Sequence, residues 1–376
     1  MSERRVAIQL VSTGGVYGAE RVLLELATYL QQQGWESHVV ALEGHGAGPL
    51  IDRARSAGLA GQAFVSSGKM PLQRLISRLR QLLESFPRAV VHSHGYKPDI
   101  LLSMLGVPRR WACVATCHNW ISETTKMRAL EVLDRYALRR FDHVVAVSDE
   151  VAQKLLRGGV ERQRVSRIDN GVAVPPASSD ARARLRAELA IPPDAPLLVQ
   201  IGRLARSKRN DLLLEAVAAL PRAFEAHVLL VGEGERRAYL AELALARGIG
   251  PRVHLCGYRS DVSDILVAAD LLALTSDIEA MPIVILEAMA TRCPIVSTCV
   301  GAIPQVLEAG RDAWIVPPDD ADRLTAALHE ALSEPQLARR RAGAAYDRFV
   351  QRFSREAMGA AYLKLYDALW TQRHWP

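Results

Sequence analysis

Two acidic residues frame a short apolar segment in the second half of the chain. Glu279 and Glu287 are separated by seven residues whose side chains are all apolar or small. Pro282 suits the first position of a helix, so we expect Glu279 just before that helix and Glu287 in its second turn. Carboxylates beside an otherwise apolar helix start are costly unless polar groups satisfy them. The pattern favours a site for a hydroxyl-rich ligand over the alternative, a helix-dipole acid and an ordinary surface glutamate.

A second candidate group is a pair of cations that follows an apolar run. Gly202 and Arg203 end this run, and Lys208 lies five residues after Arg203. A guanidinium offers a planar fork and an ammonium a mobile point charge. The two can therefore bind one diphosphate and neutralise it as a leaving group without a metal ion. A solvated basic loop is the alternative interpretation.

The first half of the chain contains a glycine-rich turn. Gly14, Gly15 and Gly18 lie between an apolar run and an amphipathic stretch, where exposed backbone N–H groups suit a phosphate. A tight turn without a ligand is the alternative. The dinucleotide-binding pattern G-x-G-x-x-G is absent, although Glu43 could imitate its ribose-binding acid.

Three histidines end or follow expected strands. His118 comes directly after one strand, on the side where ligands bind in α/β folds, beyond the carboxyl ends of the strands. A satisfied structural histidine is the alternative. His92 and His94 end the preceding strand, and we expect alternation to point only one of them, His94, toward the ligand.

The elements that must position these residues follow one pattern along the whole chain. Short β-branched or leucine-rich runs alternate with amphipathic stretches, which is typical of βαβ units and predicts an α/β fold. We expect helices over residues 19–33, ended by Gly34, and over 149–156, capped by Ser148. In the first half, strands are expected near residues 6–11, 37–41, 62–65, 90–93, 112–116, 143–147 and 165–168.

A stretch rich in Pro, Ala and Ser, residues 171–196, indicates a linker between two domains. We expect an N-terminal domain over residues 1–174 and a C-terminal domain over 175–354. In the second, strands are expected near residues 197–201, 226–231, 253–255, 271–274, 295–297 and 313–316.

The last helical stretch needs a surface to pack on. One face of residues 355–370 carries Met358, Tyr362, Leu365, Tyr366 and Leu369. Because the second series has no strand left to cover, we expect residues 355–376 to cross back onto the N-terminal domain.

Residues 69–88 form another amphipathic pattern, with an apolar stripe opposite Arg74, Arg78 and Arg80. Packing of the stripe on the sheet is the simpler interpretation, and peripheral contact with an anionic membrane is the alternative.

Composition narrows the class of protein. The 376 residues, 49% hydrophobic, suffice for two α/β domains. Residues 1–170 hold 23 Lys and Arg against 16 Asp and Glu, so this half could face nucleic acid, an anionic membrane or a phosphorylated acceptor. No nucleic-acid motif supports the first option. Five scattered cysteines and no signal-peptide pattern predict a cytosolic protein, and no apolar run reaches the roughly 20 residues of a membrane span.

The sequence offers little for a metal ion. Its one D-x-D, Asp320 to Asp322, lies at an expected helix start, where acids are ordinary first-turn residues. We therefore expect no metal site and no cofactor.

These motifs, in this order, resemble the retaining glycosyltransferases of family 4 over nearly the whole chain. The N-terminal match, GGVYGAERVLLELATYL and DNGV, is weaker than the C-terminal one. The resemblance implies a GT-B fold, in which two Rossmann-like domains, for acceptor and donor, face each other across a cleft. The specific C-terminal segments are IGRLARSKRNDLLLEA, LLVGEGERRAYLAELA, VHLCGYRSDVSDILVAADLLALTS and the E-x7-E stretch with PIVSTCVGAIPQVLEAG after it.

By position, the resemblance also implies roles. Arg203 and Lys208 would hold the donor diphosphate, Glu279 would bind sugar hydroxyls and His118 would contact the transferred sugar; these four are the candidate catalytic residues. Ala280 stands where the family usually has Gly, so a methyl group crowds the sugar there. The further donor contacts are Gly15 at the distal phosphate, Glu287 at the ribose, Gly257, Tyr258 and Arg259 at the base, and Gly202, Met281, Pro282 and Ile283. Candidates for acceptor contact are Glu20, His94, Lys97 and Asn119.

The expected reaction is metal-independent, retaining transfer of a hexose from a UDP- or GDP-linked sugar to a glycan or lipid-linked acceptor. Bacterial surface polysaccharide or glycolipid assembly is the expected setting, in the cytoplasm or peripherally at the inner face of the membrane. Three alternatives remain: a sugar-nucleotide epimerase of similar fold, which needs no acceptor; a NAD-dependent oxidoreductase, whose fingerprint is missing; and a catalytically silent sugar-nucleotide-binding subunit.

Overall fold

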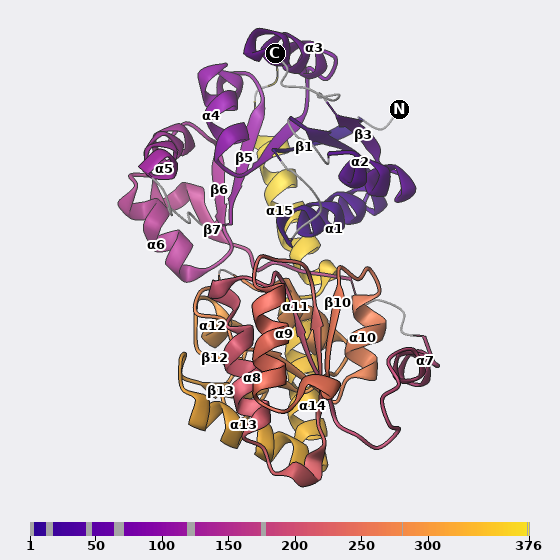
Figure 1. Ribbon diagram of the computed structural model, residues 1–376. Helices are drawn as coiled ribbons and strands as arrows, with labels where there is room; N and C mark the ends of the chain where they lie inside the picture. Colours follow the sequence, from indigo (N-terminus) through magenta and orange to yellow (C-terminus); the bar gives the residue numbers. More distant parts are fainter. Residues whose placement is uncertain are drawn as a thin grey trace. The chain divides into compact units, whose positions relative to one another are not determined.

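The computed structural model describes residues 4–12, 18–42, 47–63, 71–118, 125–173, 178–279, 281–373 and 375. Gly15, Glu43, Asn119 and Ala280 lie outside the described residues. The chain divides into two compact units, Met1–Ala173 with Arg355–Pro376, and Val174–Ser354. Each is a parallel sheet flanked by helices (Figure 1). The chain is thus α/β throughout, as its sequence predicts.

The first unit is built on a sheet of seven described strands in the order β3-β2-β1-β4-β5-β6-β7. The strands are β1 (Arg5–Val11), β2 (Trp35–Ala41), β3 (Ala60–Ala63), β4 (Val90–His94), β5 (Ala112–Cys117), β6 (His143–Ala146) and β7 (Val165–Arg167). The helices are α1 (Gly18–Gln32), α2 (Ala47–Ser56), α3 (Leu72–Glu84), α4 (Tyr96–Met104), α5 (Thr125–Leu138), α6 (Asp149–Arg157) and α15 (Arg355–Gln372).

Helix ends follow the local signals of the sequence. The hydroxyl of Ser148 accepts a hydrogen bond from the backbone N–H of Val151 at 3.3 Å, which caps α6. After α1, Gly34 has φ of +82°, a conformation that only glycine adopts without strain.

Two sets of apolar side chains fill the two faces of the first sheet. In β2, Val39 packs with α1 and α2 and Val40 packs with α3 and its neighbours, because successive strand residues point to opposite faces. Leu75, Leu79 and Leu83 of α3 are buried in the second set. Most of the apolar stripe of α3 therefore packs in the core, which is the simpler interpretation. Leu72 at its start is 60% exposed, and Arg74, Arg78 and Arg80 are exposed.

The final helix α15 packs within the first unit (Figure 1). Tyr366 lies edge-on to Trp35 of β2, with ring centroids 5.5 Å apart. Asp367 accepts from Arg5 of β1 at 2.9 Å. A Cβ on Gly359 would lie 2.3 Å from the ring of Tyr29, so α15 and α1 are in contact at this glycine.

The second unit has a sheet of six described strands in the order β10-β9-β8-β11-β12-β13. The strands are β8 (Leu197–Ile201), β9 (His227–Val231), β10 (Val253–Gly257), β11 (Leu271–Leu274), β12 (Ile295–Thr298) and β13 (Trp314–Val316). The helices are α7 (Ala181–Glu188), α8 (Asn210–Ala218), α9 (Arg237–Ala246), α10 (Val262–Ala268), α11 (Ile283–Ala290), α12 (Ile303–Val306), α13 (Ala321–Ser333) and α14 (Pro335–Arg352).

The predicted linker, residues 171–196, is mostly not a linker. It contains α7, and its Arg186 is 6% exposed. The Arg186 guanidinium pairs with Asp270 at 2.9 Å and donates to the carbonyls of Pro192 and Ala195. Proline and alanine content indicated a loop here, but these contacts fasten the segment to the second unit.

Among the described residues, no helix has the length and apolar content that crossing a membrane requires.

Candidate functional site

One edge of the second sheet brings two predicted loops together. β8 and β11 are neighbours, with Leu198 paired to Leu271, and the strand order reverses between them. Residues 202–209 follow β8 and residues 275–282 follow β11. Ligands of open α/β sheets bind beyond the carboxyl ends of strands at such a reversal. The predicted cations and the first acid of the E-x7-E segment therefore share one site.

Lys208 and Glu279 form an ion pair within this site. The Lys208 Nζ lies 2.6 Å from Oε1 of Glu279, and the Ser276 hydroxyl donates to the same oxygen at 2.6 Å. The Glu279 side chain is 8% exposed and the Lys208 side chain 24%. A Cβ on Gly202 would lie 3.8 Å from Cε of Lys208, so the lysine stem passes beside this glycine. The ammonium is thus held between the two loops.

Arg203 differs from Lys208 in its surroundings. It is exposed, and its guanidinium makes no ion pair with any residue that the structure describes. An anionic ligand could engage Arg203 without first breaking a protein contact of this kind.

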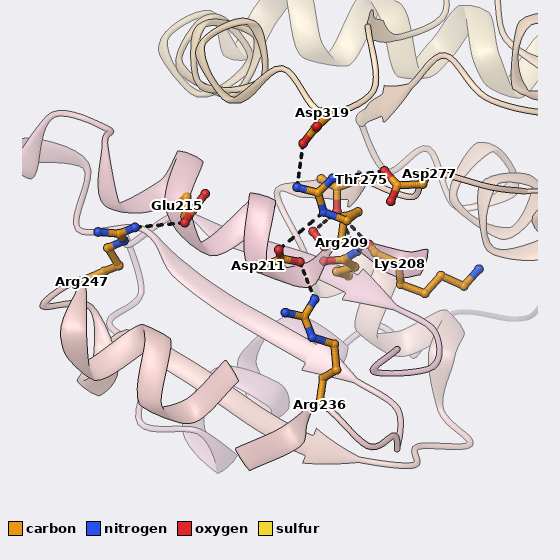
Figure 2. Close-up of polar contacts among 10 residues, drawn as sticks. Lys208, Arg209, Asp211, Glu215, Arg236, Arg247, Thr275, Asp277 and Asp319 are labelled. Carbon is orange, nitrogen blue, oxygen red and sulfur yellow. Dashed lines mark hydrogen bonds and ion pairs between the residues drawn. The ribbon is translucent and has the colours of Figure 1, made fainter. Parts of the chain in front are cut away.

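Arg209 fastens the loop after β8 to three other segments (Figure 2). It has φ of +47° and ψ of +43°, a left-handed conformation that costs a residue with a Cβ about 1 kcal/mol or more. Its guanidinium lies 2.8 Å from Asp319, 3.3 Å from Asp277 and 3.5 Å from Asp211. The Lys208 side chain points away from these carboxylates (Figure 2). These ion pairs offset the backbone strain at Arg209. They do not involve Lys208, whose ammonium pairs with Glu279 instead.

Two further side chains hold the backbone of this loop. Thr275 donates to the carbonyl of Arg209 at 2.8 Å, and Gln200 donates to that of Lys208 at 2.9 Å. Helix α8 begins at Asn210, directly after the left-handed Arg209, which cannot belong to it. The backbone of Lys208 is therefore fixed by the protein itself, the kind of preorganisation that electrostatic catalysis requires.

Glycines allow three loops of the second unit to approach closely. A Cβ on Gly232 would lie 2.0 Å from the carbonyl oxygen of Gly202, and one on Gly234 would lie 2.2 Å from that of Leu204. Gly257 has φ of +65°, and its carbonyl accepts from the N–H of Gly232 at 2.7 Å. Larger side chains at these positions would push the loop that carries Arg203 away from its neighbours.

The loop predicted to meet the base has two different side chains. Tyr258 is 67% exposed. Arg259 pairs with Asp261 at 2.6 Å and also with Glu188, and these hydrogen-bonded carboxylates raise its pKa. The prediction that these residues bind a base stays a prediction.

The E-x7-E segment runs into α11 as expected, with one shift. Pro282 is the N-cap, with ψ of 114°, and the helix begins at Ile283 rather than at Pro282. Glu287 lies in the second turn and is 3% exposed, and Met281 and Ile283 are 7% and 8% exposed. A buried acid here needs polar partners, which an ordinary surface glutamate does not, so that alternative for Glu287 is excluded.

The first unit brings three histidines together at the ends of β4 and β5. Ring centroids are 4.2 Å apart for His92 and His94 and 5.7 Å apart for His94 and His118. The expectation that alternation separates His92 from His94 is wrong, since residues two apart on a strand point to the same face. They differ in depth along the strand instead, and only His94 contacts His118.

Burial keeps these histidines neutral. It lowers the pKa of His92 to about 3 and that of His118 to about 4, and it lowers the pKa of His94 well below its usual value. Each ring at neutral pH therefore has one nitrogen that donates and one that accepts.

The remaining acceptor candidates lie at two helix starts. Glu20 is in the first turn of α1 and is 7% exposed. Lys97, in the first turn of α4, is exposed. These helices follow β1 and β4, between which the first sheet reverses its order. Gly15 and Asn119 lie outside the described residues.

Asp320, the first acid of the D-x-D, has a structural role. It is the N-cap of α13, and its carboxylate accepts from the backbone N–H of Arg323 at 2.9 Å. In the part of the chain that the structure describes, no group of three or more His, Cys, Asp or Glu residues could hold a metal ion.

Sequence reasoning missed the residues that support both sites. Gln200 interrupts the apolar run of β8, and Gln9 interrupts that of β1. A polar side chain inside an apolar strand needs a partner, so both were detectable as buried polar positions. Nothing local marked the role of Arg209, because two of its three carboxylate partners, Asp277 and Asp319, come from distant segments.

Two family descriptions match most of the chain. Residues 16–174 match the family described as Glycosyltransferase Family 4. Residues 181–348 match the family described as Glycosyl transferases group 1.

Curated relatives include glycosyltransferases of several kinds. The alpha-D-kanosaminyltransferase of Streptomyces kanamyceticus is 27% identical over 77% of this chain and 80% of its own length. The lipopolysaccharide core biosynthesis glycosyltransferase LpsD of Rhizobium meliloti is 26% identical over 93% of this chain and 95% of its own. LpsE of that organism is 34% identical, but the match spans 48% of this chain and about half, 52%, of that protein.

Solved structures share the fold over nearly the whole chain. The Anabaena protein HepE in complex with UDP has a TM-score of 0.84 at 20% identity, with 96% of this chain and 99% of that chain covered. WaaG, a glycosyltransferase involved in lipopolysaccharide biosynthesis, has a TM-score of 0.73 at 19% identity, with 97% and 99% covered. At these identities the likeness shows the GT-B fold alone. Together with the two family matches, it establishes that this chain belongs to the family 4, or group 1, glycosyltransferases.

Proposed function

We propose that this glycosyltransferase is retaining and metal-independent and transfers a hexose from a UDP- or GDP-linked sugar to a glycan or lipid-linked acceptor. The observation that carries the proposal is the pairing of Lys208 with Glu279 where the second sheet reverses its strand order, with Arg203 in the same loop as Lys208. Two cations and a buried carboxylate in one site suit a ligand that joins a diphosphate to hydroxyl groups.

Lys208 would act on the diphosphate while keeping Glu279 satisfied. Glu279 alone would repel a diphosphate, but the ammonium 2.6 Å away offsets that charge. As the bond between sugar and phosphate breaks, negative charge grows on the leaving oxygen, and preorganised cations stabilise it. The carboxylate of Glu279 would accept hydrogen bonds from hydroxyl groups of the sugar.

In the proposed retaining mechanism, no enzyme nucleophile is needed. The bond from donor sugar to phosphate lengthens first, and the acceptor hydroxyl attacks from the face that the phosphate leaves. The departing phosphate takes the hydroxyl proton. Lys208 and Arg203 stabilise the negative charge that develops on this phosphate.

The setting we propose is surface polysaccharide, lipopolysaccharide or glycolipid assembly. Relatives described as lipopolysaccharide core glycosyltransferases support it, and so do fold neighbours with bound UDP or UDP-glucose. A lipid-linked acceptor would bring the protein to the cytoplasmic face of a membrane. Because most of the apolar side of α3 is used in the core, attraction would come mainly from exposed Arg74, Arg78 and Arg80, at about 1 kcal/mol each near an anionic surface. Flotation with anionic liposomes tests this: a triple Glu variant that floats like the wild type would exclude it.

A binding panel tests the proposed function most simply. Thermal unfolding of the purified protein is measured with UDP- and GDP-linked hexoses, with free UDP and GDP, and with NAD as the control ligand. A ligand at 100 times its Kd adds about 2.7 kcal/mol to stability, so the cognate nucleotide sugar should raise Tm by several degrees and NAD should not. Stabilisation by NAD alone would favour the oxidoreductase. Binding of a nucleotide sugar without release of its nucleotide would favour the silent subunit.

A further inference from the structure

A chain of buried polar side chains runs through the first unit from the final helix to His118. It is carried by β1, β4, β5 and α15. Six polar side chains in one core are costly unless each is hydrogen-bonded. Their exposed fractions are Gln9 0%, His92 0%, His94 5%, Thr116 1%, Tyr362 2% and Tyr366 0%.

The part of this chain nearest α15 is continuous. The Tyr362 hydroxyl lies 2.7 Å from Oγ1 of Thr116. Thr116 lies 2.7 Å from Nε2 of His92, and Nδ1 of His92 lies 2.6 Å from the hydroxyl of Tyr366. The Gln9 amide nitrogen donates to that same hydroxyl at 3.0 Å.

From Gln9 the chain continues to the candidate site. The Gln9 Oε1 lies 2.9 Å from Nε2 of His94. The other ring nitrogen of His94, Nδ1, lies 3.4 Å from Nε2 of His118. No other hydrogen bond of the His118 ring is recorded among the described residues. His118 is therefore the last residue of this hydrogen-bonded series, on the side where we expect the ligand.

The Gln9 amide determines which atoms donate and which accept along this series of hydrogen bonds. An amide oxygen can only accept, so His94 must donate with Nε2–H and keep Nδ1 as its acceptor. Nδ1 of His94 then accepts a hydrogen bond from Nε2–H of His118, and in the neutral ring Nδ1 of His118 therefore carries no proton. Both rings are neutral at pH 7, because burial lowers the pKa of His118 to about 4 and that of His94 well below its usual value.

We propose that Gln9, whose amide nitrogen donates to the hydroxyl of Tyr366 and whose amide oxygen faces His94, is a positioning residue that fixes His118 as the Nε2–H tautomer. Nδ1 of His118 then accepts a hydrogen bond from a hydroxyl group of the bound sugar. The contact with sugar rests on the proposed function, whereas the tautomer is a property of the unliganded protein. If the amide were reversed, every donor in the chain would reverse with it, and His118 would offer Nδ1–H instead.

Tyr366→Phe and Tyr362→Phe form a matched pair for the test. Both remove one buried hydroxyl from the same face of α15. Only Tyr366 contacts Gln9; Tyr362 contacts Thr116 at the other end. A purely structural role of the hydroxyls would affect both variants alike.

The tautomer is read from 15N spectra of histidine-labelled protein at pH 7.5, with the His118 signals assigned by their loss in His118→Asn. We expect protonated Nε2 and unprotonated Nδ1 in the wild type and in Tyr362→Phe, and a mixture of tautomers in Tyr366→Phe. If the two forms become equal, kcat/KM for sugar transfer falls about two-fold in Tyr366→Phe, with Tyr362→Phe unchanged.

Nδ1–H at His118 in the wild type, or equal changes in the two variants, would overturn the proposal. If Tyr366→Phe shifts the tautomer of His118 but leaves kcat/KM for sugar transfer unchanged, the proposed contact between His118 and the sugar is wrong. The effect of Gln9 on the His118 ring would then still stand. If the wild type transfers no sugar, the proposed function fails, and the spectra still decide the tautomer.

Discussion

Lys208 is the residue on which the proposed chemistry depends most. Its ammonium pairs with Glu279 and its carbonyl is held by Gln200, so its position is set before a ligand binds. The loss of one well-placed electrostatic contact typically costs about 2–4 kcal/mol in the transition state. Lys208→Ala should therefore lower kcat about 30- to 1,000-fold. Steady-state kinetics with the cognate donor measure this.

Arg206 provides the control for this change. It is an exposed cation in the same turn, and Arg206→Ala should keep kcat within about two-fold of the wild type because exposed charges contribute little. A normal kcat in Lys208→Ala would contradict the role of Lys208. Equal losses in both variants would point to the general charge of the loop.

Glu287 should behave differently from Lys208. A contact with the nucleotide ribose changes little between ground and transition states, so its loss weakens both equally. We expect Glu287→Ala to raise the donor KM and leave kcat nearly unchanged. Because Glu287 is 3% exposed, thermal unfolding must show that the variant is folded at the assay temperature. A fall in kcat with unchanged KM would assign Glu287 to the reacting centre instead.

The burial of His92 predicts how the free energy of unfolding depends on pH. Burial lowers its pKa to about 3, against about 6.5 in an unfolded chain. Between these values the unfolded state binds more protons, so stability falls as pH falls, by about 1.4 kcal/mol per pH unit for one such histidine. Between pH 5 and 6, His92→Asn should therefore lower the slope of unfolding free energy against pH by about 1.4 kcal/mol per pH unit, which corresponds to about one bound proton.

Urea unfolding at several pH values measures this slope. The exposed His329 gives the control, since His329→Asn removes a histidine without a buried ring. Equal slopes in the wild type and His92→Asn would contradict the neutral state of His92.

At the scale of elements, α15 is the helix that completes the first unit. Its sequence predicts one apolar and aromatic face, and Met358, Tyr362 and Tyr366 on that face are buried. The pattern could not predict that the tyrosine hydroxyls join a polar chain, because period 3.6 identifies which face is buried and not what the face contacts.

Two mid-helix glycines should respond oppositely to alanine. Gly→Ala inside a helix normally stabilises by up to about 1 kcal/mol. Gly343 of α14 has no atom within 4 Å of a built Cβ, so Gly343→Ala should stabilise. At Gly359 of α15 the Cβ would lie 2.3 Å from the ring of Tyr29, and overpacking costs typically 1–3 kcal/mol. Gly359→Ala should therefore destabilise by about 1–2 kcal/mol.

Chemical unfolding of both variants gives the two signs. A stabilising Gly359→Ala would mean that α15 does not pack closely on α1. A destabilising Gly343→Ala would show that α14 has a contact at that glycine.

At the scale of the whole molecule, the sequence predicted the alternation of strands and helices, two α/β units and the order of the motifs. These follow from local periodicity and from strands that are buried on both faces. The supporting contacts did not follow, because they join distant positions: Gln9 and Tyr366 are 357 positions apart. Arg209 is another case, since its left-handed backbone depends on Asp277 and Asp319, which no local pattern connects to it.

Catalysis by the whole protein is tested most directly by release of nucleoside diphosphate when the cognate nucleotide sugar is hydrolysed in excess EDTA, with water in the place of the acceptor hydroxyl. The cations Arg203 and Lys208 are proposed to take the place of a metal ion at the leaving group. We therefore predict that the wild type releases the nucleotide at the same rate with and without EDTA. Abolition of release by EDTA, with recovery on adding Mg²⁺ or Mn²⁺, would contradict the proposed mechanism, and binding of the sugar nucleotide without any release would contradict enzymatic function.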